Sequence, residues 1–121
     1  MTTNKEIGAE GENLAIRTLK KKGYRIIQKN YRTKFGEIDI IAEDKDCLVF
    51  IEVKRRSTGI YGMSFDAVSR TKKGHIIRTA QCYLKEFKCQ NRKTRFDVVG
   101  IDEDEIRIVQ HAFIVEDSAV R

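Results

Sequence analysis

The chain of 121 residues has no proline, no tryptophan and only three cysteines. Cys47, Cys82 and Cys89 lack C-x-x-C spacing, which argues against a disulfide framework or a zinc ribbon and favours reduced thiols. No aliphatic or aromatic run exceeds four residues, as in Leu48–Ile51, so we expect no membrane-spanning segment. The polar start, Met1–Glu6, carries no apolar signal region. These absences together predict a cytoplasmic protein.

Charge is plentiful but unevenly placed along the chain. Charged residues make up 35% of the sequence, and the formal net charge is +6. Residues 61–95 hold 9 basic and 2 acidic side chains, whereas residues 96–121 hold 2 basic and 7 acidic side chains. A basic middle section favours a polyanionic partner such as nucleic acid. A charged surface that only keeps the protein in solution is the alternative interpretation.

The spacing of apolar residues predicts seven elements in one domain, residues 1–121. Helical spacing covers residues 5–22 and, after a glycine-containing loop at 57–62, residues 65–87. Strands are predicted over residues 24–32, 36–42, 47–54 and 95–101, with one or two more over 106–115. Short connections between the first three strands predict an antiparallel meander, with a turn at 43–46. The order α-β-β-β-α-β-β indicates an α/β fold with two helices flanking a mixed sheet.

Two of the predicted strands carry charged side chains where burial is expected. Asp39 lies within Ile38–Ile41, and Glu52 and Lys54 directly follow Leu48–Ile51. An unpaired buried carboxylate is costly, so such groups pair, bind a metal or lie at the solvated end of a strand. Because side chains alternate along a strand, Glu52 and Lys54 share one face of the sheet.

Hairpin geometry decides whether Asp39 lies on the same face. An even-length loop pairs residues whose numbers sum to an odd value such as 89 or 91. A sum of 91 places Asp39 opposite Glu52, and a sum of 89 makes them diagonal neighbours about 7–8 Å apart. An odd-length loop would turn Asp39 toward the apolar face of Val49 and Ile51. We therefore expect two carboxylates and one ammonium group to meet at one place.

This trio suits hydrolysis of a phosphodiester bond. The carboxylates of Asp39 and Glu52, the carbonyl of Val53 and water would form a hard oxygen shell for Mg²⁺ or Mn²⁺. Such an ion polarises the phosphoryl oxygen and lowers the pKa of a bound water. Lys54 would orient that water or stabilise the transition state. Glu12 reaches the site if the first helix packs beside these strands.

The same residues also permit interpretations without catalysis. The pattern E-x-K arises by chance in a highly charged chain, and an ion pair of Glu52 with Lys54 or Arg55 at a sheet edge is its ordinary explanation. A nucleic-acid-binding module is a second alternative, because phosphate neutralisation needs no metal. Glu37 shares the face of Asp39 and is either a further ligand or a flanking carboxylate.

Several sequence blocks together resemble the YraN family, small bacterial proteins with a restriction-endonuclease-like fold. The blocks are Gly8-x-x-Gly11-Glu12-x-x-Ala15-x-x-x-Leu19, Gly23-Tyr24, Asn30-x-Arg32, Gly36–Ile41, Phe50–Arg56 and Arg95–Val98. The resemblance extends over residues 5–115. That family belongs to the PD-(D/E)-x-K nuclease class and is similar to archaeal Holliday-junction resolvases.

The resemblance implies a fold, an activity and a set of site residues. The implied core is αβββαβ, and the implied activity is metal-dependent cleavage of DNA, including branched or damaged structures. Asp39, Glu52 and Lys54 occupy the three catalytic positions, and Glu12 that of the helix carboxylate. Ile38 stands where the signature has proline. A resolvase of two-fold symmetric junctions would act as a homodimer, and the sequence shows no assignable dimer surface.

Further residues are candidate nucleic-acid contacts. Those that would contact phosphate or stack on a base are Arg32, Arg55, Arg56, Tyr61, Lys72 and Lys73. Four of them have a structural alternative: Arg32 could pair with Glu37, the two lysines could lie on a solvated helix face, and Tyr61 could pack under its loop. His75 and His111 are isolated and are expected to be surface or structural residues. Arg95 and Asp97 are expected to anchor their strand by pairing.

Overall fold

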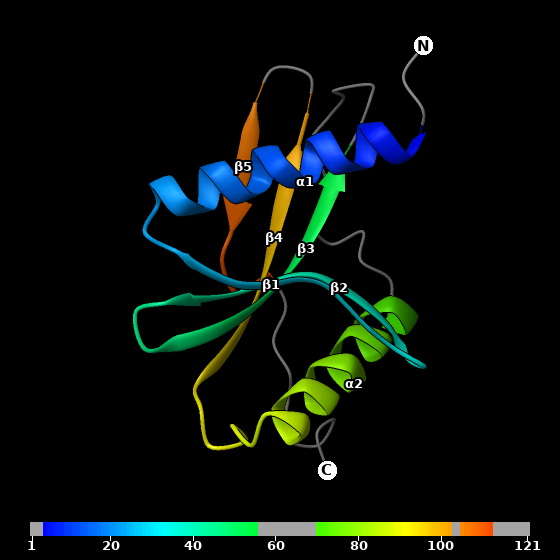
Figure 1. The fold of residues 1–121 in the computed structure, drawn as a ribbon, viewed down its shortest axis with the longest axis vertical. Coiled ribbons are helices and arrows are strands. Elements are labelled where there is room, and N and C mark those ends of the chain that lie inside the picture. Colours follow the sequence, from blue (N-terminus) through cyan, green and yellow to red (C-terminus); the bar gives the residue numbers. More distant parts are fainter. Residues whose placement is uncertain (1–3, 56–69, 103–104, 113–121) are drawn as a thin grey trace.

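A computed structural model describes residues 4–55, 70–102 and 105–112 of the chain. In these residues, seven elements follow one another in the predicted order (Figure 1). They are α1 (Asn4–Lys21), β1 (Arg25–Thr33), β2 (Gly36–Asp44), β3 (Cys47–Arg55), α2 (Arg70–Glu86), β4 (Thr94–Ile101) and β5 (Ile106–Val109). The predicted α/β class is confirmed, and the order contains the αβββαβ core that the family resemblance implies.

The strands form one sheet in the order β1-β2-β3-β4-β5. Strands β1, β2 and β3 pair antiparallel, which confirms the predicted meander. Strand β3 pairs parallel with β4, and β4 pairs antiparallel with β5. A parallel pair needs a long crossover, and α2 lies within that connection. The sheet is therefore mixed, as predicted.

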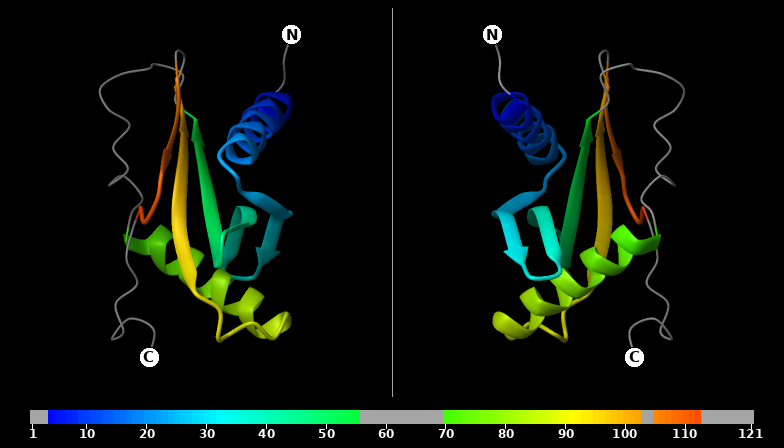
Figure 2. Two further views of the ribbon diagram at one scale, coloured as in Figure 1. Left: turned by 90° about the vertical axis from the view of Figure 1, so that its left-hand side faces the viewer. Right: turned by 90° about the vertical axis from the view of Figure 1, so that its right-hand side faces the viewer.

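The two helices cover opposite faces of β3. Leu48 and Phe50 belong to a core that α2 covers, whereas Val49 and Ile51 belong to a second core that α1 covers. This alternation is the two-residue period of a strand buried on both faces. Seen along the sheet, α1 stands to one side of β3 and β4 (Figure 2). Complete burial of a side chain such as Phe50 contributes roughly 1.5–3 kcal/mol to folding.

Helix α1 ends at a glycine, as its sequence predicts. Gly23 has a φ of 95°, and its N–H donates to the carbonyl of Lys20. The N–H of Tyr24 donates to the carbonyl of Leu19, which completes a Schellman motif. The motif turns the chain sharply into β1 and leaves Tyr24 buried.

The end of β2 differs from the sequence-based expectation. Strand β2 extends to Asp44, so the turn before β3 is Lys45–Asp46 rather than residues 43–46. Glu43 stays in the strand because Arg25 and Arg92 pair with its carboxylate. Lys45 adopts a positive φ of 59°, the conformation that two-residue hairpins favour.

Other expectations concern the second helix, the thiols and membranes. Helix α2 begins at Arg70, and predicted residues 65–69 lie outside the described part of the chain. In the described residues, no helix combines the length and apolar character needed to cross a membrane. All three cysteines are free thiols, as expected, and Cys47 is buried.

Candidate active site

The register of the β2–β3 hairpin is the one that places Asp39 opposite Glu52. Ile40 pairs with Ile51, and Asp44 pairs with Cys47, so each pair of numbers sums to 91. The turn has an even length, as the argument from the apolar pattern requires. The ladder ends at Ile40 and Ile51, one position before the two carboxylates.

Beyond the last ladder pair, a side chain replaces the backbone as hydrogen-bond acceptor. The N–H of Val53 donates to Oδ2 of Asp39 over 2.8 Å. Strand β2 continues to pair with β1 as far as Gly36, while β3 continues beside β4. The two strands thus separate at Asp39, and its carboxylate is fixed between them.

Negative charge accumulates around Asp39. Burial and, next, the charge of Glu52 raise the pKa of Asp39 from 3.8 to about 7. The hydrogen bond from Val53 opposes this shift, whereas the charges of Glu37 and Glu12 add to it. Two carboxylates forced close together in a poorly solvated place disfavour double ionisation, and a cation between them would relieve that cost. We call the four acidic residues Glu12, Glu37, Asp39 and Glu52 the carboxylate site.

Helix α1 brings Glu12 to the strands, since the neighbouring Gly11 packs against β3 and β4. A Cβ atom at Gly11 would lie 3.5 Å from Nη1 of Arg55 and 3.6 Å from Cδ1 of Ile101. Any larger side chain would have to displace these neighbours from the helix. The geometric condition set for Glu12, that the first helix packs beside the strands, is therefore met.

Asn30 of β1 holds Glu12 in this position. Its Nδ2 donates to Oε1 of Glu12 over 3.0 Å. Asn30 has a φ of 53°, a left-handed conformation in which asparagine is enriched among residues other than glycine. We did not predict this role from the sequence. The available signal was an asparagine inside a predicted strand, where it is normally disfavoured.

Glu52 pairs with a residue from α2, Lys72. It is 9% exposed, and its Oε1 lies 2.6 Å from Nζ of Lys72. The interpretation without catalysis pairs Glu52 with Lys54 or Arg55, and Lys72 is a partner that it did not include. Lys54 is half-buried and lies two positions along β3, on the face of Glu52.

The remaining predicted contacts fall into three groups. Arg32 pairs with Glu37 at 3.4 Å, which is the structural alternative proposed for it. Arg55 lies against Gly11 of α1, and Lys73 lies beside Lys72 at the start of α2. Arg56 and Tyr61 lie outside the described residues. His75 and His111 are exposed, in line with their expected surface role.

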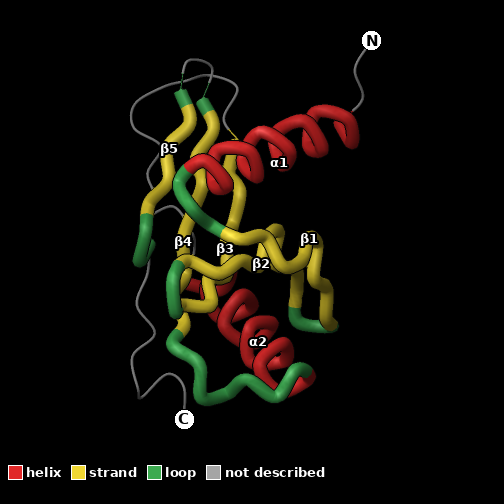
Figure 3. Tube along the Cα trace, turned by 60° about the vertical axis from the view of Figure 1, so that its left-hand side comes forward, coloured by secondary structure: helices red, strands yellow, loops and turns green. Residues whose placement is uncertain are grey.

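Two further cations, which sequence reasoning missed, gather at the β1–β2 turn. Nζ of Lys34 lies 5.2 Å from the centre of the Phe35 ring, and Cζ of Arg78 lies 5.7 Å from it. The second contact ties the turn to α2, and Figure 3 shows the β1–β2 hairpin between α1 and α2. The sequence contains little sign of these two cations, because neither residue belongs to a motif and Phe35 suggests only packing. They add positive charge next to Arg32.

The donor set fits a hard divalent cation such as Mg²⁺. Within the described residues, no three aspartate, glutamate, histidine or cysteine side chains form a cation site on their own. The predicted set needs only the carboxylates of Asp39 and Glu52, completed by the Val53 carbonyl and water. Oxygen donors of this kind suit Mg²⁺, which keeps several waters when bound. The raised pKa of Asp39 marks the unbalanced charge that a cation would offset.

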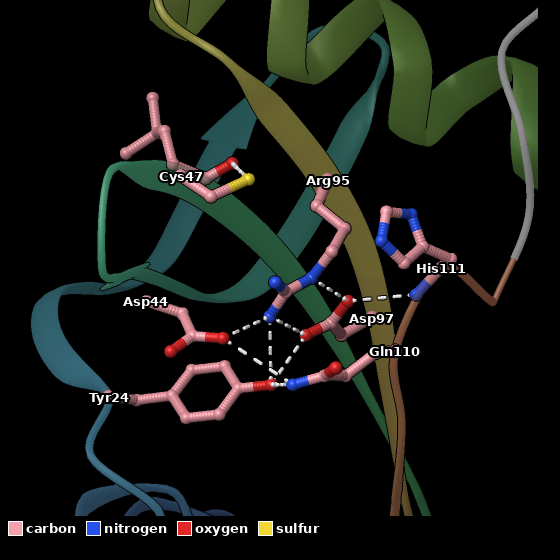
Figure 4. Close-up of polar contacts among 8 residues, drawn as sticks. Tyr24, Asp44, Cys47, Arg95, Asp97, Gln110 and His111 are labelled. Atoms are coloured by element: carbon pink, nitrogen blue, oxygen red, sulfur yellow. Dashed lines mark hydrogen bonds and ion pairs between the residues drawn. The ribbon is translucent and has the colours of Figure 1, made fainter.

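A second polar cluster lies at the other end of β3 (Figure 4). Arg95 donates to both oxygens of Asp97 at 2.8 Å, as predicted, and also to Oδ2 of Asp44 at 2.9 Å. The hydroxyl of Tyr24 donates to Asp97 at 2.7 Å and accepts from Gln110 at 3.0 Å. We call these five residues the arginine network. Burial and the bond to Asp97 raise the pKa of Tyr24 to about 12.

The arginine network is fully satisfied. The side chain of Asp97 is 0% exposed, and that of Arg95 is 9% exposed. No buried side-chain nitrogen or oxygen in the described part of the chain lacks a hydrogen-bond partner. A hollow of about 870 Å³ lies beside the network, with Lys22, Lys45 and Lys93 among its lining residues. The network joins four separate segments, and Arg95 serves both of its carboxylates.

Comparison with known sequences gives one consistent result. The model of the uncharacterised protein family UPF0102 matches residues 11–101. A UPF0102 protein of Alkaliphilus oremlandii is 49% identical over 100 residues, covering 81% of this chain and 86% of that protein. One from Thermodesulfovibrio yellowstonii is 44% identical over 108 residues, covering 89% and 96%. One from Persephonella marina is 40% identical over 106 residues, covering 88% and 91%.

Proposed function

The chain belongs to the uncharacterised protein family UPF0102, the YraN family, and we propose that it is a metal-dependent endonuclease acting on DNA. One observation carries this proposal. Asp39 lies buried next to Glu52 where the β2–β3 ladder ends, and burial together with the charge of Glu52 raises the pKa of Asp39 to about 7. Folding tolerates such like-charge crowding poorly, and it is typical of sites that bind a cation or transfer protons.

In the proposed reaction, the protein contributes position and charge. Asp39, Glu52 and the Val53 carbonyl would hold Mg²⁺ or Mn²⁺, and the bond from the Val53 N–H keeps Asp39 directed between the strands. The bound ion would supply Lewis acidity toward the phosphoryl oxygen and a lowered pKa for water. Lys54 orients the attacking water or neutralises charge on the phosphoryl oxygens. Glu12, held by Asn30, adds a flanking carboxylate.

Basic residues around the carboxylate site would hold the substrate backbone. Lys72 and Lys73 lie in the first turn of α2, and Lys34 and Arg78 lie where that helix meets the β1–β2 turn. Contacts of this kind with phosphate are independent of sequence and weaken with salt. They suit a substrate chosen by its shape, such as branched or damaged DNA.

The deciding experiment is metal-dependent cleavage of a panel of linear, single-stranded, flap and four-way DNA substrates. We expect Glu52→Gln to lower kcat/KM by at least about 100-fold while DNA binding persists, because catalysis by a metal supplies several kcal/mol. Glu105→Gln is the matched control, since Glu105 is exposed and pairs only with Arg107 in the described residues. Cleavage by Glu52→Gln at the wild-type rate would show that the site is not the one described.

A non-catalytic nucleic-acid-binding module is the second candidate. The ion pair of Glu52 with Lys72 favours it, because a carboxylate already neutralised does not require a metal. This function predicts no cleavage with Mg²⁺ or Mn²⁺ and DNA binding that is unchanged by EDTA. A calorimetric Mn²⁺ signal that disappears in Asp39→Asn would argue against it.

A further inference from the structure

One contact at the carboxylate site joins it to the crossover helix. Nζ of Lys72 lies 2.6 Å from Oε1 of Glu52, a short charge-assisted contact. The Glu52 side chain is 10% exposed, whereas that of Lys72 is 48% exposed. The pair therefore joins a nearly buried carboxylate to the ammonium of a half-exposed side chain.

We propose that Lys72 is an internal counter-ion that holds Glu52 in the metal-free protein and leaves it when the metal binds. This inference rests on the proposed function, because it assumes that Glu52 is a metal ligand. The released ammonium would then face the phosphate backbone that approaches the metal. Lys72 would thus couple metal loading to substrate binding.

Charge balance explains why such a counter-ion is needed. A buried carboxylate without a partner costs several kcal/mol, and Glu52 faces the like charge of Asp39 as well. Lys72 offsets this cost when no metal is present. A divalent cation between the carboxylates offsets it better, because it carries twice the charge and contacts both groups. The ammonium and the metal therefore compete for Glu52.

The side chain of Lys72 has the properties that this exchange requires. Lysine carries its charge on a flexible four-carbon chain, so the ammonium can swing away while the helix stays in place. Lys72 is the third residue of α2, at the end of that helix nearest Glu52. Glu52, by contrast, is held within β3, whose pairing with β4 continues past it to Arg55 and Ile101.

Calorimetric titration of Mn²⁺ into the full-length, chelator-treated protein tests the competition without measuring catalysis. We expect Lys72→Met to bind Mn²⁺ about five-fold more tightly than the wild type, the effect of an ion pair worth roughly 1 kcal/mol. Lys73→Met is the control, because it removes an equal charge about 100° further round the same helix. It should change the affinity less than two-fold.

A second measurement follows the ammonium itself. In the wild type, Mg²⁺ should shift the NMR resonances of the Lys72 side chain to those of a solvated lysine, with little change at Lys73. If the wild type binds Mn²⁺ but Lys72→Met binds it no more tightly than Lys73→Met, the counter-ion role is wrong and the proposed function stands. If the wild type binds no Mn²⁺ at all, the proposed function fails and this inference fails with it.

Discussion

The two ends of β3 hold similar side chains in opposite electrostatic states. At one end, the arginine network places Asp97 and Asp44 on a single guanidinium, with Tyr24 donating a further bond. At the other end, the carboxylate site gathers three acidic side chains around Asp39, whose own pKa rises to about 7. The first cluster shares one cation between two carboxylates, whereas the second raises the pKa of Asp39 through burial and acidic neighbours.

This difference separates structure from function within one small sheet. A fully hydrogen-bonded cluster such as the arginine network joins distant segments of the chain. Crowded carboxylates, as in the carboxylate site, lower the free energy of unfolding. Proteins retain such a cost where binding or chemistry uses it. The comparison predicts that removing the charge of Arg95 lowers the free energy of unfolding, whereas removing the charge of Asp39 raises it.

The largest effect is expected from Arg95→Met. This change leaves Asp97, whose side chain is 0% exposed, without its cation. Loss of one partner of a buried ion pair typically lowers the free energy of unfolding by about 3–5 kcal/mol. Urea denaturation measures it, and Arg107→Met is the control because Arg107 forms an exposed pair with Glu105. Equal stability of the two variants would show that the network is not structural.

Asp39→Asn is expected to have the opposite effect on stability. The folded pKa of about 7 lies above the ordinary 3.8, so the folded protein binds this proton more tightly than the unfolded chain does. The stability contributed by this protonation is complete below about pH 4 and is lost as pH rises through about 7. An amide oxygen can still accept the Val53 N–H, so Asp39→Asn should be about 2 kcal/mol more stable at pH 8.

The pH dependence makes this second prediction specific. In EDTA, the stability difference between Asp39→Asn and the wild type should grow from near zero at pH 4 to its full value at pH 8. Glu105→Gln should show no such trend, because Glu105 is exposed. DNA cleavage by Asp39→Asn should fall although its stability rises. If Asp39→Asn is less stable than the wild type at pH 8, the ionised Asp39 stabilises the fold, as Asp97 does in the arginine network.

Much of the fold could be predicted from the sequence because local patterns determine it. Helical spacing, the lysine triplet before Gly23 and the alternation in Leu48–Ile51 each reflect an interaction within one element. The parity of the hairpin register followed from the same alternation, since only one parity keeps Val49 and Ile51 in the core, but the choice of 91 over 89 did not. The extension of β2 to Asp44 was missed because its cation, Arg95, lies 51 residues away.

The site was predictable only where its residues are close in sequence. Asp39 and Glu52 belong to one hairpin, so their approach follows from its geometry. The contacts Lys72–Glu52 and Tyr24–Asp97 join residues 20 and 73 positions apart and depend on packing of the helices. A side chain such as Lys72 has many possible partners in a highly charged chain, and only tertiary structure selects one.

The smallest effect is expected at Asn30, where backbone and side-chain roles can be separated. Asn30→Gly keeps the left-handed φ of 53° at no steric cost, whereas Asn30→Ala places a Cβ in that conformation. We expect the alanine variant to be about 1 kcal/mol less stable than the glycine variant. Both lose the amide that donates to Glu12, so both should weaken Mn²⁺ binding equally.

Two measurements on this pair of variants show whether Asn30 serves the site or only the strand. Thermal denaturation measures the stability cost of the left-handed backbone at position 30. Mn²⁺ calorimetry measures whether loss of the hydrogen bond to Glu12 weakens metal binding. If Glu12 matters at the carboxylate site, both variants lose affinity although only one loses stability. If affinity follows stability instead, the hydrogen bond to Glu12 contributes nothing there. The carboxylate site would then consist of the hairpin carboxylates alone, and α1 would pack beside it without taking part.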